Sequence, residues 1–168
     1  MSYLKKFKGL SMPPPEQPRI SNIAYSWLGA LIAIGCLAAL NLLSQYPLIL
    51  GSFGASCFIL FVVPSTPYAQ PRNVIGGHFI SSLIGLIFFH VISTEWWGMA
   101  LALASCIAAM QFLKVSHPPA GSNPIIVYLS APQWGFLFSP TLIGACILVL
   151  IALFYINLRK EQTYPQYW

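Results

Sequence analysis

The sequence contains no aspartate, and only 7% of its 168 residues are charged. Its three glutamates, Glu16, Glu95 and Glu161, all lie outside the long apolar segments. Cation carriers and proton pumps generally need carboxylates inside the membrane, so this absence disfavours cation transport. Hydrolysis needs a nucleophile with a base and an orienting group, or a metal cluster, and three dispersed histidines provide neither. We therefore expect no enzyme activity, no metal site and no cofactor.

Apolar residues, in contrast, make up 57% of the chain. A charged share far below the roughly 25% of globular proteins indicates an integral membrane protein, which we expect to form one compact domain. The four cysteines each lie in a different apolar segment without a Cys-x-x-Cys spacing, so we predict that they are small buried hydrophobic residues. The net charge of +5 comes from cations beside apolar segments, which indicates membrane topology and not nucleic-acid binding.

The apolar segments predict an all-α bundle of four long spans plus two short broken helices. The long segments cover residues 23–43, 74–92, 96–114 and 136–157, and the short ones cover residues 48–63 and 120–131. Together they form a transmembrane domain over residues 21–160. A basic, proline-rich arm at residues 1–20 suits an anionic membrane surface, and residues 161–168 form a tail.

The order of long span, short broken segment and long span occurs twice, in halves of about 21–93 and 94–158. Gly54-Ala55-Ser56, an apolar run and Pro64 correspond to Ala120-Gly121-Ser122 and an apolar run that ends near Pro132. An odd number of crossings in each half would give the halves opposite orientations, which predicts a 3+3 inverted repeat. Broken helices at matching places in such repeats are a pointer to the binding site of a transporter.

The basic residues bear on this topology. If all the segments cross the membrane and the N-terminus is cytoplasmic, then the arm, Arg72, Lys114 and the Arg159-Lys160 pair lie inside and Glu95 lies outside. The positive-inside rule favours this arrangement, with both termini in the cytoplasm. In the second-ranked alternative the two short segments dip into the membrane and return, which moves Arg72 and Lys114 outside.

The stretch from Ser116 to Pro124, Ser-His-Pro-Pro-Ala-Gly-Ser-Asn-Pro, interrupts the apolar sequence. Its paired prolines exclude a regular helix and favour an extended backbone. Asn123 as N-cap and Pro124 at the first helical position then predict a short helix. An extended segment could bring this helix start to the middle of the membrane, opposite a second helix start near Ser56. Two helix N-termini facing each other would attract an anion.

Two groups carry most of the predicted chemistry. The planar guanidinium of Arg72 suits small oxyanions, although a lone arginine at this position could also reach lipid phosphate. His117 is either a hydrogen-bonded scaffold residue or a titrating group near the anion path, and both alternatives stay open. The full set of predicted substrate-binding residues is Arg72, Asn73, His117, Ser122, Asn123, Gly121, Gly54, Ser56 and His78.

The third apolar segment also has features that favour packing. Gly77, Ser81 and Gly85 lie four residues apart on one face, which lets a neighbouring segment approach closely without implying a functional role. His78 lies one turn inside the same segment. A histidine in that position is more often a packing or hydrogen-bonding residue than a ligand.

These motifs resemble the HPP family of integral membrane proteins, named for the tripeptide seen here as His117-Pro118-Pro119. The resemblance covers roughly residues 12–157 and includes Pro13–Pro15, Ser26–Ala30, Gly54–Ser56, Gln70–His78 and His117–Gly121. Members are usually described as having four spans, which corresponds to the four long segments. After Ala120-Gly121 the family has a more uniformly small and apolar run, whereas this chain has Ser122-Asn123-Pro124.

The resemblance also implies a function. Some plant and cyanobacterial members are linked to nitrite transport, so it implies transport of nitrite or a similar small monovalent anion, here across a bacterial inner membrane. The expected partners are a small inorganic anion and the lipid bilayer, with no nucleic acid, and so small a bundle often associates into a homo-oligomer. The alternative is a non-transporting scaffold or accessory subunit that recruits a partner through the basic arm. A membrane-embedded enzyme ranks last.

Overall fold

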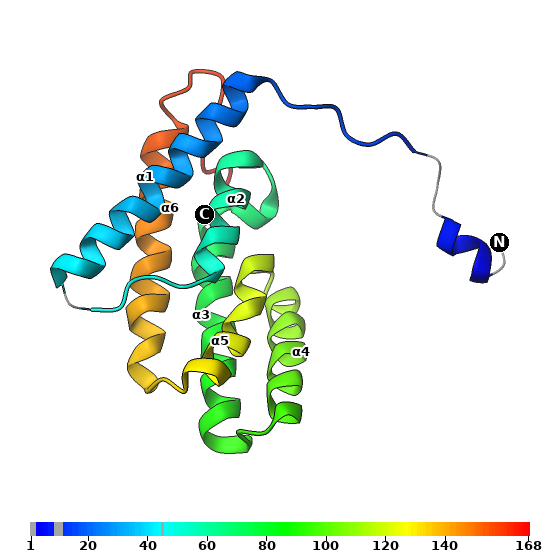
Figure 1. Cartoon of the computed structure of the whole chain (residues 1–168), viewed down its shortest axis with the longest axis vertical. Helices are drawn as coiled ribbons and strands as arrows, with labels where there is room; N and C mark the ends of the chain where they lie inside the picture. Colours follow the sequence, from blue (N-terminus) through cyan, green and yellow to red (C-terminus); the bar gives the residue numbers. More distant parts are fainter. Residues whose placement is uncertain (1–2, 9–11, 45) are drawn as a thin grey trace.

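The computed structural model describes residues 3–8, 12–44 and 46–168. Parts of the predicted arm (residues 1–2 and 9–11) and residue 45 of the predicted turn at 44–47 lie outside the described residues. Within the described residues the fold is all-helical, as predicted, and has no strand. The six α-helices of Figure 1 are α1 (Ile20–Ser44), α2 (Ser52–Val62), α3 (Pro71–Ile87), α4 (Trp96–Phe112), α5 (Asn123–Ser130) and α6 (Ile143–Ile156).

Short helical turns extend some of these helices. A π-turn, η3 (Phe88–Ile92), continues α3, and the turns η5 (Trp134–Leu137) and η6 (Phe138–Leu142) precede α6. In the described part of the chain, three stretches are therefore long and apolar enough to cross a bilayer: Ile20–Ser44 with 25 residues, Pro71–Ile92 with 22 and Trp134–Ile156 with 23. The fourth predicted long span, α4, is apolar but shorter, with 17 residues.

Proline and left-handed residues set several helix limits. α3 begins at Pro71, whose missing N–H is not needed in a first helical turn. α5 ends at Ser130, because Ala131 has a positive φ of 45° and Pro132 follows directly. Lys114, with a φ of 56°, likewise reverses the chain after α4.

The segment that contains α2 runs antiparallel to α1. The amide of Leu48 donates to Asn41 Oδ1 near the end of α1 (2.8 Å), and the Ser26 hydroxyl near its start donates to the Phe61 carbonyl oxygen (2.9 Å). The segment therefore returns along α1 for about 22 Å at 1.5 Å per residue.

The segment that contains α5 runs beside α3 in the same direction. Val115 lies against Gly76 in the first turns of α3. The Tyr128 hydroxyl donates to the Ser93 carbonyl oxygen (2.6 Å), just beyond the end of η3. Residues 115–128 therefore follow the whole of α3 and do not turn back.

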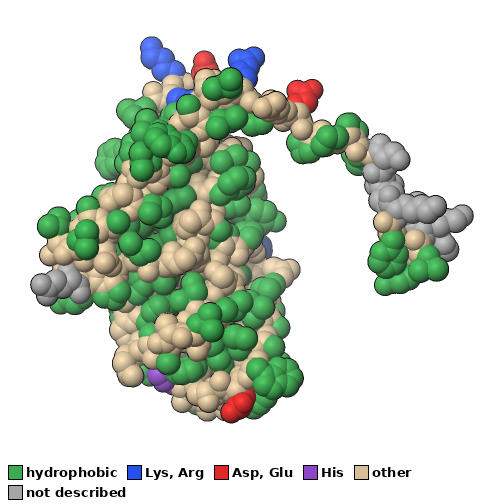
Figure 2. Space-filling model, viewed as in Figure 1, with side chains coloured by type: hydrophobic (Ala, Val, Ile, Leu, Met, Phe, Trp, Pro, Cys, Tyr) green, Lys and Arg blue, Asp and Glu red, His purple; other side chains and the backbone are tan. Residues whose placement is uncertain are grey.

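Because successive segments alternate in direction, α1 and α3 begin on the side of the bundle where α2, α4 and α6 end. We call it the tail side, because the Tyr164 hydroxyl of the C-terminal tail donates there to the Ala69 carbonyl oxygen (2.8 Å). On the opposite side, which we call the far side, His90 Nε2 donates to the Pro132 carbonyl oxygen (2.8 Å). Figure 2 shows hydrophobic side chains over the visible flank and Lys and Arg gathered near the start of α1.

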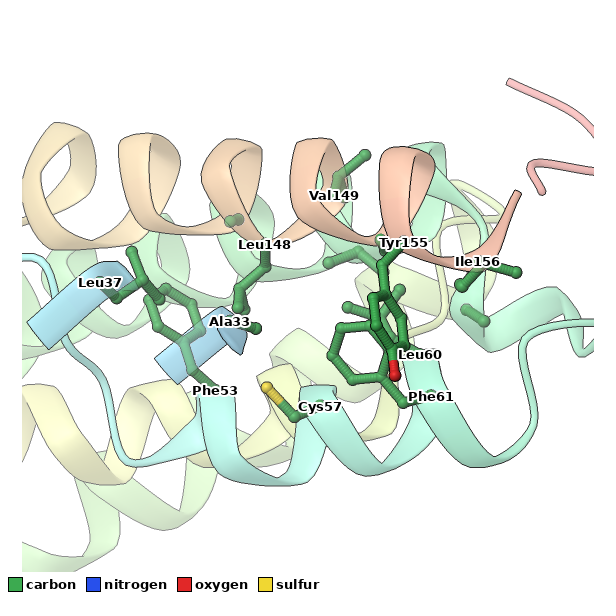
Figure 3. Packing of buried hydrophobic residues seen from close by; sticks show 14 of the residues in the cluster. Ala33, Leu37, Phe53, Cys57, Leu60, Phe61, Leu148, Val149, Tyr155 and Ile156 are labelled. Atoms are coloured by element: carbon green, nitrogen blue, oxygen red, sulfur yellow. The ribbon is translucent and has the colours of Figure 1, made fainter. Parts of the chain in front are cut away.

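The main apolar core lies between α1, α2 and α6 (Figure 3), around Leu37, Phe53 and Leu148. α6 can approach α2 because residue 144 is glycine: a Cβ there would collide with the Phe53 ring. Phe53 in turn packs edge-on against His78, with 5.0 Å between ring centroids. The core therefore fixes the position of a histidine ring at the centre of the bundle.

The stretch Ser116–Pro124 differs from its prediction in two respects. Its backbone is extended only as far as His117, and Pro118–Ser122 form a 3-10 turn, η4, because prolines with φ near −65° fit a first helical turn as well as an extended chain. Asn123 is not an N-cap: it has helical φ and ψ (−61° and −40°), and Ser122 precedes the helix. The side chain of Asn123 is thus available for other contacts.

Candidate functional site

Polar side chains gather in the middle of this apolar bundle. We call them the central cluster, which consists of Ser56, His78, Ser82, His117, Asn123 and Thr141, all with 0% exposure. A buried polar atom without a hydrogen bond costs about 1–3 kcal/mol. The cluster is therefore stable only if its members satisfy one another.

Residues from α2, α3 and α5, from the segment before η4 and from η6 form the cluster. His78 and Ser82 are four residues apart on α3 and so share one face of that helix. Ser56 comes from α2, and Asn123 is the first residue of α5. His117 approaches α3 closely because residue 77 is glycine, where a Cβ would stand 2.7 Å from the Cβ of His117.

A chain of hydrogen bonds runs through the cluster. Asn123 Nδ2 lies 3.1 Å from His78 Nδ1, and His78 Nε2 lies 2.9 Å from Ser56 Oγ. Ser56 Oγ lies 2.8 Å from His117 Nε2, and His117 Nδ1 lies 2.7 Å from the Tyr68 carbonyl oxygen. Each link joins residues that are far apart in sequence.

The groups at the two ends of this chain of hydrogen bonds determine which nitrogen atoms carry a hydrogen. The Tyr68 carbonyl oxygen can only accept, so His117 Nδ1 carries a hydrogen, and when His117 is neutral its Nε2 accepts from the Ser56 hydroxyl. At the other end Asn123 Nδ2 donates to His78 Nδ1, so His78 Nε2 carries a hydrogen and donates to Ser56 Oγ. Both imidazoles are neutral in this arrangement.

Two buried polar atoms at the site have no partner among the described residues: Asn123 Oδ1 and Ser52 Oγ. Asn123 Nδ2 also lies 2.9 Å from Ser82 Oγ, which lies 3.1 Å from Thr141 Oγ1, so only its oxygen is unpaired. Ser52 stands at the first position of α2. The starts of α2 and α5 each therefore carry a free hydrogen-bonding atom.

Hollows flank the cluster on both sides. One of about 410 Å³ on the tail side is lined by Tyr68, His117 and Gly121 together with the last turns of α4. Another of about 630 Å³ on the far side is lined by residues 46–51 and 132–140 together with part of α5. The lining of the first hollow includes His117, a member of the cluster. The lining of the second includes Gly51 and Pro140, which directly precede Ser52 and Thr141 in sequence.

Of the predicted site residues, the structure brings together Ser56, His78, His117 and Asn123. Asn73 lies at the start of α3, where its Nδ2 donates to the Ser116 carbonyl oxygen (3.0 Å) and so holds the residue before His117.

The other predicted residues lie outside the cluster. Arg72 is exposed on the tail side, with Nη2 3.4 Å from the Leu113 carbonyl oxygen. The Ser122 hydroxyl donates to the Pro119 carbonyl oxygen (2.9 Å) within its own turn. Gly121 lines the tail-side hollow. Gly54 is exposed and faces open space.

The sequence analysis did not select Ser52, Ser82 or Thr141. Ser82 could have been predicted from the sequence, since it is polar and lies one helical turn after His78 in a long apolar segment. Close packing along the Gly77–Gly85 face is confirmed, and the approaching segment is residues 115–124.

Residues 15–165 match the family model described as "HPP, transmembrane region". Two curated proteins of Dictyostelium discoideum, both described only as transmembrane proteins, are 35% identical to this chain over 181 residues. Each match covers 100% of this chain, but the chain spans only 64% and 58% of the lengths of these relatives. The comparison with solved structures gave no match.

Proposed function

The chain belongs to the HPP family of transmembrane proteins, and from that premise we propose that it transports a small monovalent anion, nitrite or a similar one, through the central cluster. Family membership and the apolar helices make it a multi-pass protein of a lipid bilayer. The observation that carries the proposal is the meeting of two short helices, α2 and α5, at the same point of α3 with their N-terminal ends toward the cluster.

The charge distribution supports an anionic substrate. Each helix N-terminus is equivalent to about half a positive charge, and its free N–H groups attract anions. The buried polar side chains of the described chain include no carboxylate that would repel an anion. Ser52, at the start of α2, offers a buried hydroxyl without a partner.

The alternation of segments supports the predicted inverted repeat. The first half runs from the tail side to the far side, back, and across again, and the second half repeats this order in the opposite sense. In each half the middle segment contains a short helix that starts near the centre. Repeats of this kind permit alternating access, in which a central site opens first to one side and then to the other. The two hollows lie where such openings would form.

The positions of charged residues support a cytoplasmic tail side. Arg159 donates to Asn22 Oδ1 (3.1 Å) and Arg72 contacts the Leu113 carbonyl oxygen, so both arginines lie on that side. The positive-inside rule then favours a cytoplasmic position for both ends of the described bundle. In this proposal the protein is a transporter and not an enzyme, and its location in a bacterial inner membrane stays a prediction.

The test is uptake of nitrite, nitrate, formate and chloride into proteoliposomes at neutral pH, with empty liposomes as the baseline. Ser52→Ala is the informative variant, because it removes a hydroxyl that makes no hydrogen bond in the fold. If that hydroxyl binds the anion, losing a hydrogen bond to a charged ligand costs about 1.5–3 kcal/mol, roughly a ten- to hundredfold loss of affinity.

The matched control is Ser105→Ala, which removes a half-buried hydroxyl on α4 that lines neither hollow. We expect this variant to match the wild type. Wild-type vesicles that take up none of the four anions above the baseline would contradict the proposed function.

A further inference from the structure

The central cluster lacks a fixed positive charge. Among the described residues, the buried polar side chains include two histidines and no lysine or arginine. Moving an unpaired anion from water into a low-dielectric interior is very unfavourable. Helix dipoles offset only part of that cost, so an anion at this site needs a further cation.

We propose that a proton supplies this charge: the His78–Ser56–His117 chain takes up one proton when the anion binds, and the protein moves both in the same direction. The inference rests on the proposed anion transport and adds its coupling ion.

The hydrogen-bonding capacity of Ser56 argues for a single extra proton. Its Oγ has three neighbours: His78 Nε2 at 2.9 Å, His117 Nε2 at 2.8 Å and the Ser52 carbonyl oxygen at 3.1 Å. A hydroxyl can donate one hydrogen bond and accept two. All three contacts are hydrogen bonds only when both Nε2 atoms carry hydrogens, which requires one proton more than two neutral imidazoles hold.

Proton uptake then needs only a small rearrangement. The Ser56 hydroxyl hydrogen turns from His117 Nε2 to the Ser52 carbonyl oxygen, and an incoming proton binds the lone pair freed on Nε2. An N–H bond forms, no heavy-atom bond breaks, and the positive charge spreads over the imidazolium ring. Release reverses these steps. His117 lines the tail-side hollow, which gives the proton a path from that side.

Other groups beside the pair do not compete for this proton. The titratable side chains on the surrounding elements are thiols and phenols, which ordinarily stay protonated and neutral near neutral pH, together with two cations on the tail side. They are Cys57 on α2, Cys106 on α4, Tyr128 on α5, Cys146 and Tyr155 on α6 and Tyr68, with Arg72 near the start of α3 and Lys114 just after α4. Imidazole is the group that changes charge in this range.

The experiment measures proton and nitrate movement in the same vesicles. Nitrate is the probe because its conjugate acid is too strong to cross lipid on its own. Wild-type proteoliposomes contain a pH-sensitive dye, and a potassium ionophore clamps the membrane potential. We expect an inward nitrate gradient to acidify the lumen with one proton per nitrate.

The variants distinguish a loss of proton uptake by the His78–Ser56–His117 chain from a general loss of stability. His117→Gln and Ser56→Ala should each lower proton-coupled uptake about tenfold or more, because a buried charge loses its stabilising partner. Ser56→Thr, which keeps the hydroxyl, should restore it. His90→Gln is the matched control, since His90 is exposed on the far side and bonds only to the Pro132 carbonyl oxygen.

The outcomes distinguish this inference from the proposed function. Nitrate uptake that carries charge and leaves the luminal pH unchanged would overturn the inference and leave anion transport intact. If wild-type vesicles transport nothing, proton uptake is measured instead on purified protein in weakly buffered detergent solution. Uptake of protons on nitrate addition, with a matching change in imidazole ¹⁵N shifts, would support protonation of the His78–Ser56–His117 chain, and no uptake would overturn it.

Discussion

Replacing Gly77 by alanine tests how tightly the His117 segment is packed on α3. A Cβ at residue 77 would lie 2.7 Å from His117 Cβ and 3.0 Å from the Val115 carbonyl oxygen. Neither contact is with the end of a flexible side chain, so the segment itself must move. The Ser56–His117 hydrogen bond of 2.8 Å would then lengthen or break.

Two opposing terms determine the magnitude of the effect. Alanine in place of glycine inside a helix gains about 0.5–1 kcal/mol, whereas overpacking costs about 1–3 kcal/mol. The lost hydrogen bond adds about 1 kcal/mol to the cost. Gly77→Ala should therefore be destabilised by roughly 1–3.5 kcal/mol.

Gly54→Ala is the matched control, because it lies in α2 with nothing within 4 Å of its added Cβ. It should show only the stability gained when alanine replaces glycine inside a helix, about 0.5–1 kcal/mol. The two variants therefore differ in stability by about 1.5–4.5 kcal/mol, which for a chain of this size separates their melting temperatures by about 3–18 °C.

The measurement is thermal unfolding in detergent, followed with a thiol-reactive dye that labels the buried Cys57 and Cys106 as they become exposed. Nitrate uptake by the same two variants then reports on the site. If Gly77→Ala melts with Gly54→Ala and transports normally, the placement of His117 against α3 is wrong.

Further predictions concern residues around the site. Arg72→Ala should change anion uptake less than about twofold, because its contact is exposed and long, and exposed electrostatic contacts contribute little; a large loss would return Arg72 to the mechanism. Asn123→Leu should destabilise the bundle by about 1–3 kcal/mol in thermal unfolding, since it leaves His78 Nδ1 without a buried partner and removes one of the two partners of Ser82 Oγ; a stability equal to that of the wild type would contradict the network. Burial raises the pKa of the Tyr164 phenol in the tail, so the unfolded chain releases this proton first and stability should fall as the pH rises above about 10. Tyr164→Phe should lack that part of the pH dependence, and an identical profile would refute it. Removing residues 1–20 should leave uptake unchanged, and loss of function with intact folding would favour the scaffold alternative.

The sequence predicted the helical segments well because their apolar runs are long and uninterrupted. It also selected four members of the central cluster, since polar residues in an apolar segment stand out. The hydrogen bonds between them could not be predicted. Ser56 contacts residues 22 and 61 positions away, and Asn123 contacts one 45 positions away, and local propensity contains no information on such pairs.

The errors have local causes. Pro118 and Pro119 fit both an extended chain and the first turn of a helix, and packing against α3 selected the turn. Asn123 was predicted to cap its own helix, but His78 and Ser82 offered it partners on another helix. Arg72 was selected for its chemistry, which does not reveal that its side chain points toward the surface.

The opposite directions of α2 and α5 have a consequence for the direction of flux. Both helices place their positive ends at the centre and their negative ends toward the two faces of the membrane. An anion that leaves the centre therefore passes through a similar change in electrostatic potential in either direction. Such a site has no intrinsic preference for import or export, and the concentration gradients on either side decide which one occurs.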